Sequence, residues 1–199
     1  MPPRITALEP AAPDLVAAWR GIEEGAFLSV RREVRRRGGA GSAEPVVAQL
    51  GAVAGALRAV VQALPDEAFA LPGGEGDWNV AQALGHTADS RAGLALAAGL
   101  AASGRFPPDA PHVVQGIPGE PDATRAALVR QIDRSQRIIE RAGRQVAGHE
   151  ADPCPLVHPQ VGQLRCGEWL LFAGVHDLMH LEQLEGIEAQ LAGGRTAAP

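Results

Sequence analysis

The chain contains no tyrosine and no lysine, and it has only two cysteines in 199 residues. Cys154 and Cys166 are too few and too widely spaced for a disulfide framework or a Cys-x-x-Cys redox motif. A run of about 18 apolar residues, which a membrane-spanning helix needs, is also missing. The opening residues MPPRITALEP lack the apolar core of a signal peptide. We therefore expect a cytoplasmic protein without a membrane span.

Negative charge exceeds positive charge, because the chain has 18 arginines and 23 acidic residues, and its formal net charge is −5. An acidic chain is not expected to hold DNA or RNA through a broad electrostatic surface. Aromatic residues amount to only 4%, whereas apolar residues together make up 46%, the composition of a soluble globular protein. Abundant alanine and leucine favour helices. The length suits a single domain with a sizeable core.

Apolar residues recur every three or four positions along most of the chain, which is the spacing of amphipathic helices. Strand-like alternation is nearly absent. Two stretches rich in glycine and proline, 103–119 and 148–166, are expected to be loops, and the second is long enough to indicate either a functional role or disorder. The spacing predicts five helices, at residues 14–37, 45–64, 79–102, 121–146 and 167–191.

These helices predict an all-α fold with three parts. A four-helix bundle (44–192) follows an N-terminal extension with one helix (1–43) and precedes a disordered tail (193–199). Asp14 is expected to cap the first helix, and Asn79 with Gln82 forms the pattern of a capping box. The connections are long enough for an up-down-down-up topology as well as a simple up-down one, and the spacing does not choose between them.

Two histidines, His176 and His180, stand one helical turn apart in the last predicted helix. At 100° per residue their side chains are about 40° apart, so both rings lie on one face, which is otherwise largely apolar. His86 lies in the third predicted helix. Small residues around an imidazole leave space for a ligand, water or a close partner helix. The neighbours of His86 on the helix surface are all small or polar: Asn79, Ala83, Ser90, Gly93 and Ala97.

Two histidines at i and i+4 can close on one metal ion, because imidazole nitrogens bind Zn, Ni, Fe and Cu. A third protein ligand from a facing helix, with the remaining position open, would give the arrangement of catalytic rather than structural zinc sites. The same spacing also occurs in exposed polar residues on ordinary helices. Burial favours the metal interpretation, since each buried ring nitrogen needs a partner. His158, in the preceding loop, could add to such a site or fix the loop above it.

Two stretches of the chain resemble the DinB-like, DinB/YfiT-type superfamily of four-helix bundles. The first, DWNVAQALGHTADS (77–90), is similar to the family's pattern of a Trp, a helix cap and a His seven residues after the cap. The second, HPQVGQLRCGEWLLFAGVHDLMHLEQL (158–184), resembles the family's HP-containing loop followed by a helix with HxxxHxxQ. The resemblance extends over about residues 45–192. Cys166 and Gly167 depart from it, because they stand where the family usually has a Thr or Ser cap.

The resemblance implies an up-down-down-up bundle, often a homodimer, with a three-histidine site for a divalent metal such as Zn, Ni, Fe or Mn. By motif position the ligands are His86, His176 and His180, and Gln183 matches the Gln that follows the second helical His. The superfamily includes thiol-dependent transferases and isomerases that use mycothiol or bacillithiol. Its name implies nothing about binding to DNA.

A metal-dependent enzyme is therefore the first functional hypothesis, either a thiol-dependent S-transferase or a hydrolase acting on an unknown small molecule. The metal would activate water or a thiol. Asp89, Asp177 and Gln183 are candidates for orienting the ligands, with Asp89 favoured over Asp177, which is turned about 100° from His176. Ordinary solvated polar positions are the alternative for all three. No catalytic residue is assigned.

Two other hypotheses stay open. The protein could be a non-catalytic metal-binding helical module of a stress response. It could also bind nucleic acid or protein through RREVRRR, residues 31–37, which holds five arginines. Nucleic acid is the less favoured partner, because arginines also suit a helix C-terminus and Glu33 lies among them. The N-terminal helix could cover the bundle, contribute to a dimer or restrict access to the metal.

Overall fold

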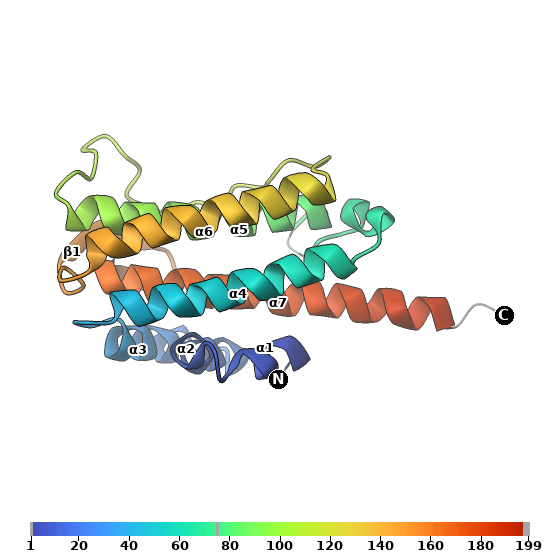
Figure 1. The fold of residues 1–199 in the computed structure, drawn as a ribbon, viewed down its shortest axis with the longest axis horizontal. Helices are drawn as coiled ribbons and strands as arrows, with labels where there is room; N and C mark the ends of the chain where they lie inside the picture. The colour runs from blue at the N-terminus through green and yellow to red at the C-terminus, as the bar shows by residue number, and fades with distance from the viewer. Residues whose placement is uncertain (1, 75, 197–199) are drawn as a thin grey trace.

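The computed structural model describes residues 2–74 and 76–196, and helices dominate it (Figure 1). The predicted all-α class is confirmed, with a small two-stranded sheet added. The elements in chain order are α1 (Pro3–Leu8), α2 (Pro13–Glu23), α3 (Phe27–Arg37), α4 (Ala43–Ala63), the 3-10 helix η1 (Asp66–Ala70), α5 (Val80–Ala102), α6 (Arg125–Val146), β1 (Pro153–His158), β2 (Gly162–Arg165) and α7 (Cys166–Thr196).

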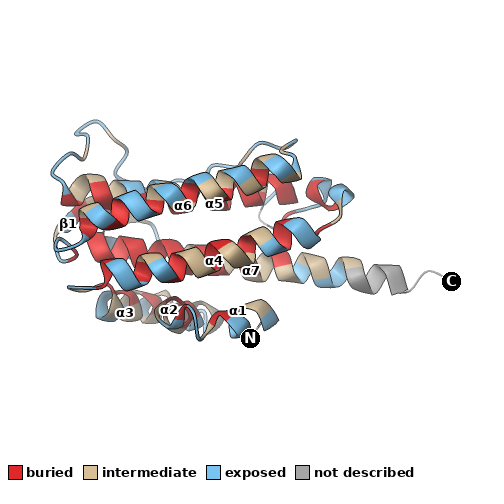
Figure 2. Cartoon of the chain, in the orientation of Figure 1, coloured by how far each residue is buried: buried red, intermediate tan, exposed pale blue. Residues whose placement is uncertain are grey.

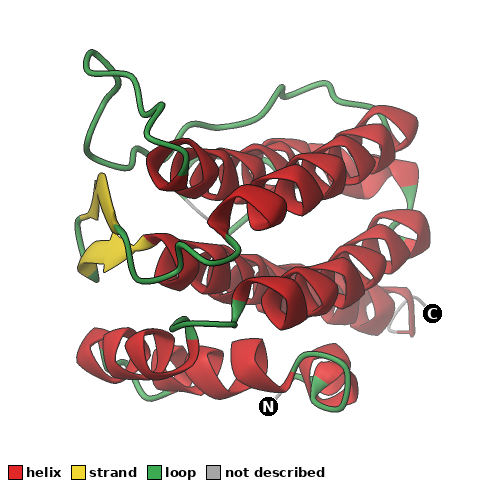
Figure 3. Ribbon diagram, turned by 60° about the vertical axis from the view of Figure 1, so that its left-hand side comes forward, coloured by secondary structure: helices red, strands yellow, loops and turns green. Residues whose placement is uncertain are grey.

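Four long helices, α4 to α7, form the bundle. Helix α5 packs against α6 and α7, and α4 packs against the same two helices, so α4 and α5 lie diagonally across the bundle. Figure 1 shows α4 and α7 running in one direction and α5 and α6 in the other, which is the up-down-down-up topology. Because α5 and α6 are parallel neighbours, the connection 103–124 has to return along the length of the bundle (Figures 1 and 3).

The core consists of the apolar stripes that the sequence predicts. In α4 the side chains of Val46, Leu50, Val53, Leu57 and Val60 are all buried. The first half of α7 is buried on every side (Figure 2), because the bundle covers one face and the N-terminal helices cover the other. A Cβ atom at Gly174 would lie 2.5 Å from Cδ1 of Leu15 in α2. A larger residue at position 174 would therefore require the Leu15 side chain to move.

The N-terminal extension contains three helices, and the prediction of a single helix at 14–37 is wrong. Gly25 has φ +64°, a conformation that ends α2, and α3 then folds back along α2. The apolar spacing continues across this turn, so periodicity alone does not reveal it. Asp14 does not cap the helix either. It lies in the first turn of α2, where its carboxylate accepts hydrogen bonds from Arg37 and Gln49. The extension covers the face formed by α4 and α7.

The stretch 148–166, predicted as a loop, contains the antiparallel hairpin of β1 and β2. Pro153 and Pro155 lie within β1, and because proline cannot donate to a sheet ladder they weaken the sequence signal of a strand. Burial alternates in part of the strand, with Cys154 and Leu156 inward. Gly162, at φ +73°, closes the turn. The hairpin gives the segment before α7 a fixed shape.

The other helices match their predicted ranges more closely, apart from the C-terminal end of the chain. Helix α7 continues to Thr196, so residues 193–196 of the predicted disordered tail are helical, and residues 197–199 lie outside the described part. Helix α4 is long and apolar enough to cross a membrane, by length and composition alone. Its apolar stripe is buried in the bundle, which fits a soluble protein.

The capping box at the start of α5 is confirmed. The Asn79 side chain accepts a hydrogen bond from the Gln82 backbone N–H (2.8 Å), and the Gln82 side chain accepts one from the Asn79 backbone N–H (3.1 Å). The Asn79 amide also donates to the carbonyl of Pro121. This box fixes the start of the helix that carries His86.

Replacing Asn79 with alanine should lower the free energy of unfolding by about 1–2 kcal/mol, because the cap to α5 is lost. Urea unfolding measures the change. Ser42→Ala is the matched control, since Ser42 occupies the same position of α4 without a side-chain cap bond. Equal effects of the two substitutions would contradict a stabilising role for the capping box.

Candidate metal centre

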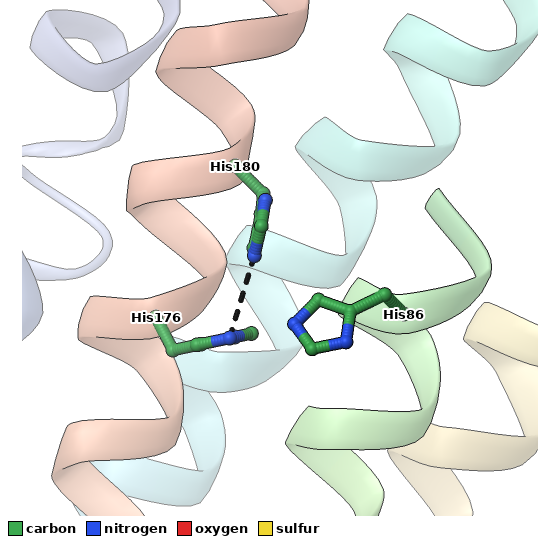
Figure 4. Close-up of side chains that lie close together, drawn as sticks. All are labelled: His86, His176 and His180. Carbon is green, nitrogen blue, oxygen red and sulfur yellow. Dashed lines mark hydrogen bonds between the residues drawn. The ribbon is translucent and has the colours of Figure 1, made fainter. Parts of the chain in front are cut away.

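Three histidines from two facing helices meet inside the bundle. His86 comes from α5, and His176 and His180 come from α7, with one candidate ligand atom of each lying within 4.8 Å of the others. Figure 4 shows the three rings directed towards a common point. The Nε2 atoms of His176 and His180 are 3.3 Å apart. Nitrogens that bind one tetrahedral zinc ion at 2.0–2.1 Å lie about 3.4 Å from each other, so this pair has the spacing of two ligands.

The His86 ring is held by the connection between α5 and α6. Its Nδ1 atom lies 2.8 Å from the carbonyl oxygen of Ile117, to which it donates a hydrogen bond. The proton therefore resides on Nδ1, and Nε2 keeps its lone pair for the centre of the site. Trp78 packs against the same ring, with the ring centroids 4.9 Å apart. Both contacts orient His86 before any ligand binds.

Two glycines bring the Ile117 carbonyl to this position. A Cβ atom at Gly119 would lie 2.6 Å from Cα of Gly85, so the backbone of the connection touches the backbone of α5. The Gly119 N–H donates to the carbonyl of Gln82 at the same place. Sequence reasoning missed this contact. The one signal for it was Gly85, a glycine inside a predicted helix next to a candidate ligand.

Gln183 holds the ring of His180. Its Oε1 atom lies 2.9 Å from Nδ1 of His180, while its amide nitrogen donates to the carbonyl of Gly73. Because the amide nitrogen is engaged, the oxygen accepts the proton of Nδ1, and Nε2 of His180 is left to face His176. Gln183, which the sequence made a candidate for orienting a ligand, thus contacts one of the three histidines.

Asp89 and Asp177 are not at the three histidines, although the sequence made both of them candidates for orienting the rings. Asp177 is fully buried on another face of α7, where its Oδ2 atom lies 2.6 Å from Nε of Arg91. The turn of about 100° per residue takes its side chain away from His176. Asp89 is exposed on α5 and lines neighbouring surface cavities. Neither carboxylate touches a ligand ring in the described structure.

A cavity of about 550 Å³ opens over the histidines, and His158 lines it. The ring of His158 packs edge-on against Phe172, with centroids 4.9 Å apart. Its Nδ1 atom accepts a hydrogen bond from the Gln160 backbone N–H (3.2 Å). His158 therefore both fixes the hairpin turn and forms part of the cavity wall, but it lies outside the three-histidine group.

The interior of the site disfavours positive charge on the ring of His176. Burial holds the pKa of His176 well below its ordinary value of 6.5, and proximity to His180 and His86 lowers this pKa further. The Nδ1 atom of His176 is buried and has no hydrogen-bond partner among the described residues. His176 is therefore neutral at pH 7, which is the protonation state that a metal ligand requires.

The stability of the metal-free protein should depend on pH through His176. Below pH 6.5 the unfolded chain binds a proton at this residue and the folded chain does not, so the free energy of unfolding falls as the pH falls. The expected contribution of His176 to the slope is at most about 1.4 kcal/mol per pH unit. Urea unfolding between about pH 5 and 8 measures it. His176→Asn should flatten the slope, and an unchanged slope in this variant would contradict the assignment.

The arginine cluster 31–37 is partly neutralised within the structure. Arg36 and Arg37 both pair with Glu33, at 2.7 and 3.2 Å, and Arg37 also pairs with Asp14 at 2.5 Å. Hydrogen bonding from Arg36 lowers the pKa of the Glu33 carboxyl. Less positive charge is therefore available to nucleic-acid phosphates than the sequence indicates.

Comparison with known proteins supports the resemblance seen in the motifs. Curated proteins and solved structures gave no significant match. A family model described as the DinB superfamily matches residues 49–184, which is more than half of the chain and contains all three histidines. The three-histidine group fits a metal-binding protein of this kind. The chain belongs to the DinB superfamily.

Proposed function

We propose that the protein is a divalent-metal-dependent enzyme in which His86, His176 and His180 hold the ion. One observation carries the proposal: the candidate ligand atoms of three histidines from two helices lie within 4.8 Å of one another beneath a cavity of about 550 Å³. Three imidazoles with an open side are the donor set of catalytic metal sites. Zn, Ni, Fe and Mn all accept such ligands, and cellular supply selects among them.

The arrangement of the rings supports this assignment. Ile117 and Gln183 accept the Nδ1 protons of His86 and His180, so both rings present Nε2 to the centre. Hydrogen bonds of this kind orient metal-binding histidines and raise their basicity. When bound, a divalent ion would lower the pKa of a coordinated water or thiol, which makes it a nucleophile near neutral pH.

The protein's own cysteines do not supply a thiol nucleophile. Cys154 and Cys166 are both buried, and burial raises the pKa of the Cys166 thiol to about 12. Burial shifts the pKa of Cys154 in the same direction. Both sulfurs stay protonated at neutral pH and are poor nucleophiles. A thiol-transfer reaction would therefore use a low-molecular-weight thiol such as bacillithiol or mycothiol, and hydrolysis would use water.

His158 contributes a polar group to the cavity. Because its Nδ1 atom accepts a backbone hydrogen bond, the neutral ring carries its proton on Nε2. Burial lowers the pKa of His158 below its ordinary value, so the neutral form prevails at pH 7. We assign it the role of hydrogen-bond donor to a substrate. No other residue is assigned to the chemistry.

Metal analysis and an activity assay test the proposal together. Protein purified without a histidine tag should contain one divalent ion per chain. With bacillithiol or mycothiol and a chlorinated nitrobenzene, mass spectrometry should detect the thioether product. An ester substrate without thiol tests for hydrolysis. One ion per chain without either reaction would favour the non-catalytic metal-binding module, and absence of the ion would overturn the metal site.

Gln183→Ala should weaken metal affinity by about 10- to 100-fold, because the hydrogen bond that orients His180 is lost. Competition with a chromogenic chelator measures the affinity. Gln190→Ala, an exposed glutamine further along α7, serves as the control and should bind metal like the unmodified protein. Equal metal affinities in the two variants would show that Gln183 does not orient a metal ligand.

The assembly and location of the protein are predictions. A homodimer follows from the family resemblance, and light scattering after gel filtration tests it. The cytoplasm as location and the absence of a nucleic-acid partner follow from composition and charge. A salt-dependent mobility shift of DNA at moderate ionic strength would contradict the predicted absence of a nucleic-acid partner.

A further inference from the structure

We propose that the substrate carries an apolar alkyl or aryl group, which binds in a groove that continues from the three-histidine site along α5. The inference rests on the proposed metal-dependent function, because the metal would act on the polar end of the same molecule. The groove lies between α5 and the connection 103–124.

The groove is a second cavity that shares a wall with the cavity over the histidines. Its volume is about 450 Å³, within the usual range of small-molecule sites. Ser90, Leu94, Val114 and Gln115 line both cavities. The two cavities are therefore adjacent, and we infer that a molecule with its polar end at the histidines reaches the groove past these four side chains.

The lining of the groove is chemically apolar. Asp89 is the only charged residue in the described lining. The connection contributes Phe106, Pro107 and Pro111 to the wall opposite α5. The apolar lining residues include Leu96, Ala97, Leu100, Phe106, Pro107 and Ile117.

Apolar side chains on both walls of the groove are exposed to solvent. Leu96 of α5 is 44% exposed, and Ile117 of the connection is 66% exposed. Exposed apolar side chains are ordinary when they are scattered, but gathered around one groove they indicate a ligand surface. Ile117 is also the residue whose carbonyl oxygen holds His86. The backbone segment at Ile117 therefore both forms part of the groove wall and orients His86.

Gly93 keeps the groove open. It lies in the middle of α5, where glycine destabilises a helix by a measurable amount relative to alanine. A Cβ atom built at this position would meet nothing within 4 Å, and Gly93 lines the groove. No close packing requires a glycine here. The lack of a side chain at Gly93 therefore leaves the volume of the groove free.

A series of alkyl hydroxamates tests the inference on the zinc-loaded protein. The hydroxamate group binds zinc, and the alkyl chain from acetohydroxamate to octanohydroxamate probes the groove. Binding of each compound is measured by calorimetry. Affinity should rise about threefold to fourfold for each methylene that becomes buried, and the total gain should exceed about 30-fold.

Gly93→Phe should remove most of this gain, because the new side chain fills the groove. Binding of acetohydroxamate should be unchanged, because this short compound does not reach the groove. Gly55→Phe is the matched control. Gly55 lies inside α4, where a Cβ atom would also meet nothing within 4 Å, and it is not part of the groove. Leu96→Asp is a second variant, which places a charge on an exposed wall residue and should also weaken only the longer compounds.

The outcomes separate this inference from the proposed function. If acetohydroxamate binds through His176 but affinity does not rise with chain length, the groove inference is overturned and the metal site stands. An undiminished gain in both Gly93→Phe and Leu96→Asp would overturn it as well. If the gain is seen equally in unmodified protein and in His176→Ala, the groove is supported and the proposed metal-dependent function fails.

Discussion

Replacing Asp177 with alanine is expected to lower the free energy of unfolding by about 3–5 kcal/mol, because the substitution strands a buried positive charge. Arg91 and Asp177 are both 0% exposed, and their charged atoms lie 2.6 Å apart. Burial raises the pKa of Asp177 to about 6 against the opposing effect of Arg91, so the carboxylate is charged at pH 7. Urea unfolding of the metal-free protein at that pH measures the loss.

The rest of the arginine's hydrogen bonds show why the loss should be large. The Arg91 guanidinium also donates to Ser135 (2.8 Å), to the carbonyl of Leu50 (3.0 Å) and to Gln136 (3.1 Å). These neutral acceptors stay in place in the variant, but none of them balances the charge. The pair joins α5 to α7, the two helices that carry the three histidines.

A double variant provides the control for this prediction. Arg91→Met combined with Asp177→Leu removes both charges and should recover much of the stability lost in Asp177→Ala, because apolar side chains of similar size often replace a buried ion pair at little cost. A loss of unfolding free energy below about 1 kcal/mol in Asp177→Ala would contradict the prediction. It would show that water or a rearrangement neutralises the effect of the unpaired Arg91 charge.

His176→Ala is expected to lower metal affinity by more than about 100-fold, beyond the 10- to 100-fold effect typical of residues that only orient a ligand. His176 supplies one of the three candidate ligand atoms, and its Nε2 atom faces that of His180. Elemental analysis of dialysed protein measures the metal content, and chelator competition measures the affinity.

His149→Ala is the matched control for His176. His149 has a side chain that is 54% exposed and pairs with Asp152 at 2.8 Å, away from the three-histidine group. This variant should keep one ion per chain. If His176→Ala and the unmodified protein hold the same amount of metal with the same affinity, the ion is bound elsewhere and the proposed function is wrong.

Interactions between neighbours in the chain could be predicted from the sequence. The spacing of apolar residues predicts the four bundle helices, and the pattern Asn79–Gln82 predicts the capping box that the structure confirms. The relation of His176 to His180 is equally local, because four residues of α-helix always place two side chains on one face. The small residues after His86 predicted space beside that ring, and the groove lies along Ser90, Gly93 and Ala97.

The partners of these residues across the fold could not be predicted in the same way. Periodicity describes one helix at a time, so it did not show that Arg91 meets Asp177 or that the Ile117 carbonyl meets His86. The family resemblance, rather than the spacing, brought His86 together with the histidines of α7. Asp89 and Asp177 each lie close to a candidate ligand in the sequence, yet both face other directions in the fold.

The sequence by itself determined the four bundle helices, the capping box of α5 and the shared face of the two histidines in α7, because these depend on residues within a few positions of each other. Only the tertiary structure decided the turn at Gly25, the hairpin, the orientation of His86 and the groove along α5. Each of these depends on which segments pack against each other. The contact of Gly85 with Gly119, from separate segments of the chain, is the clearest case.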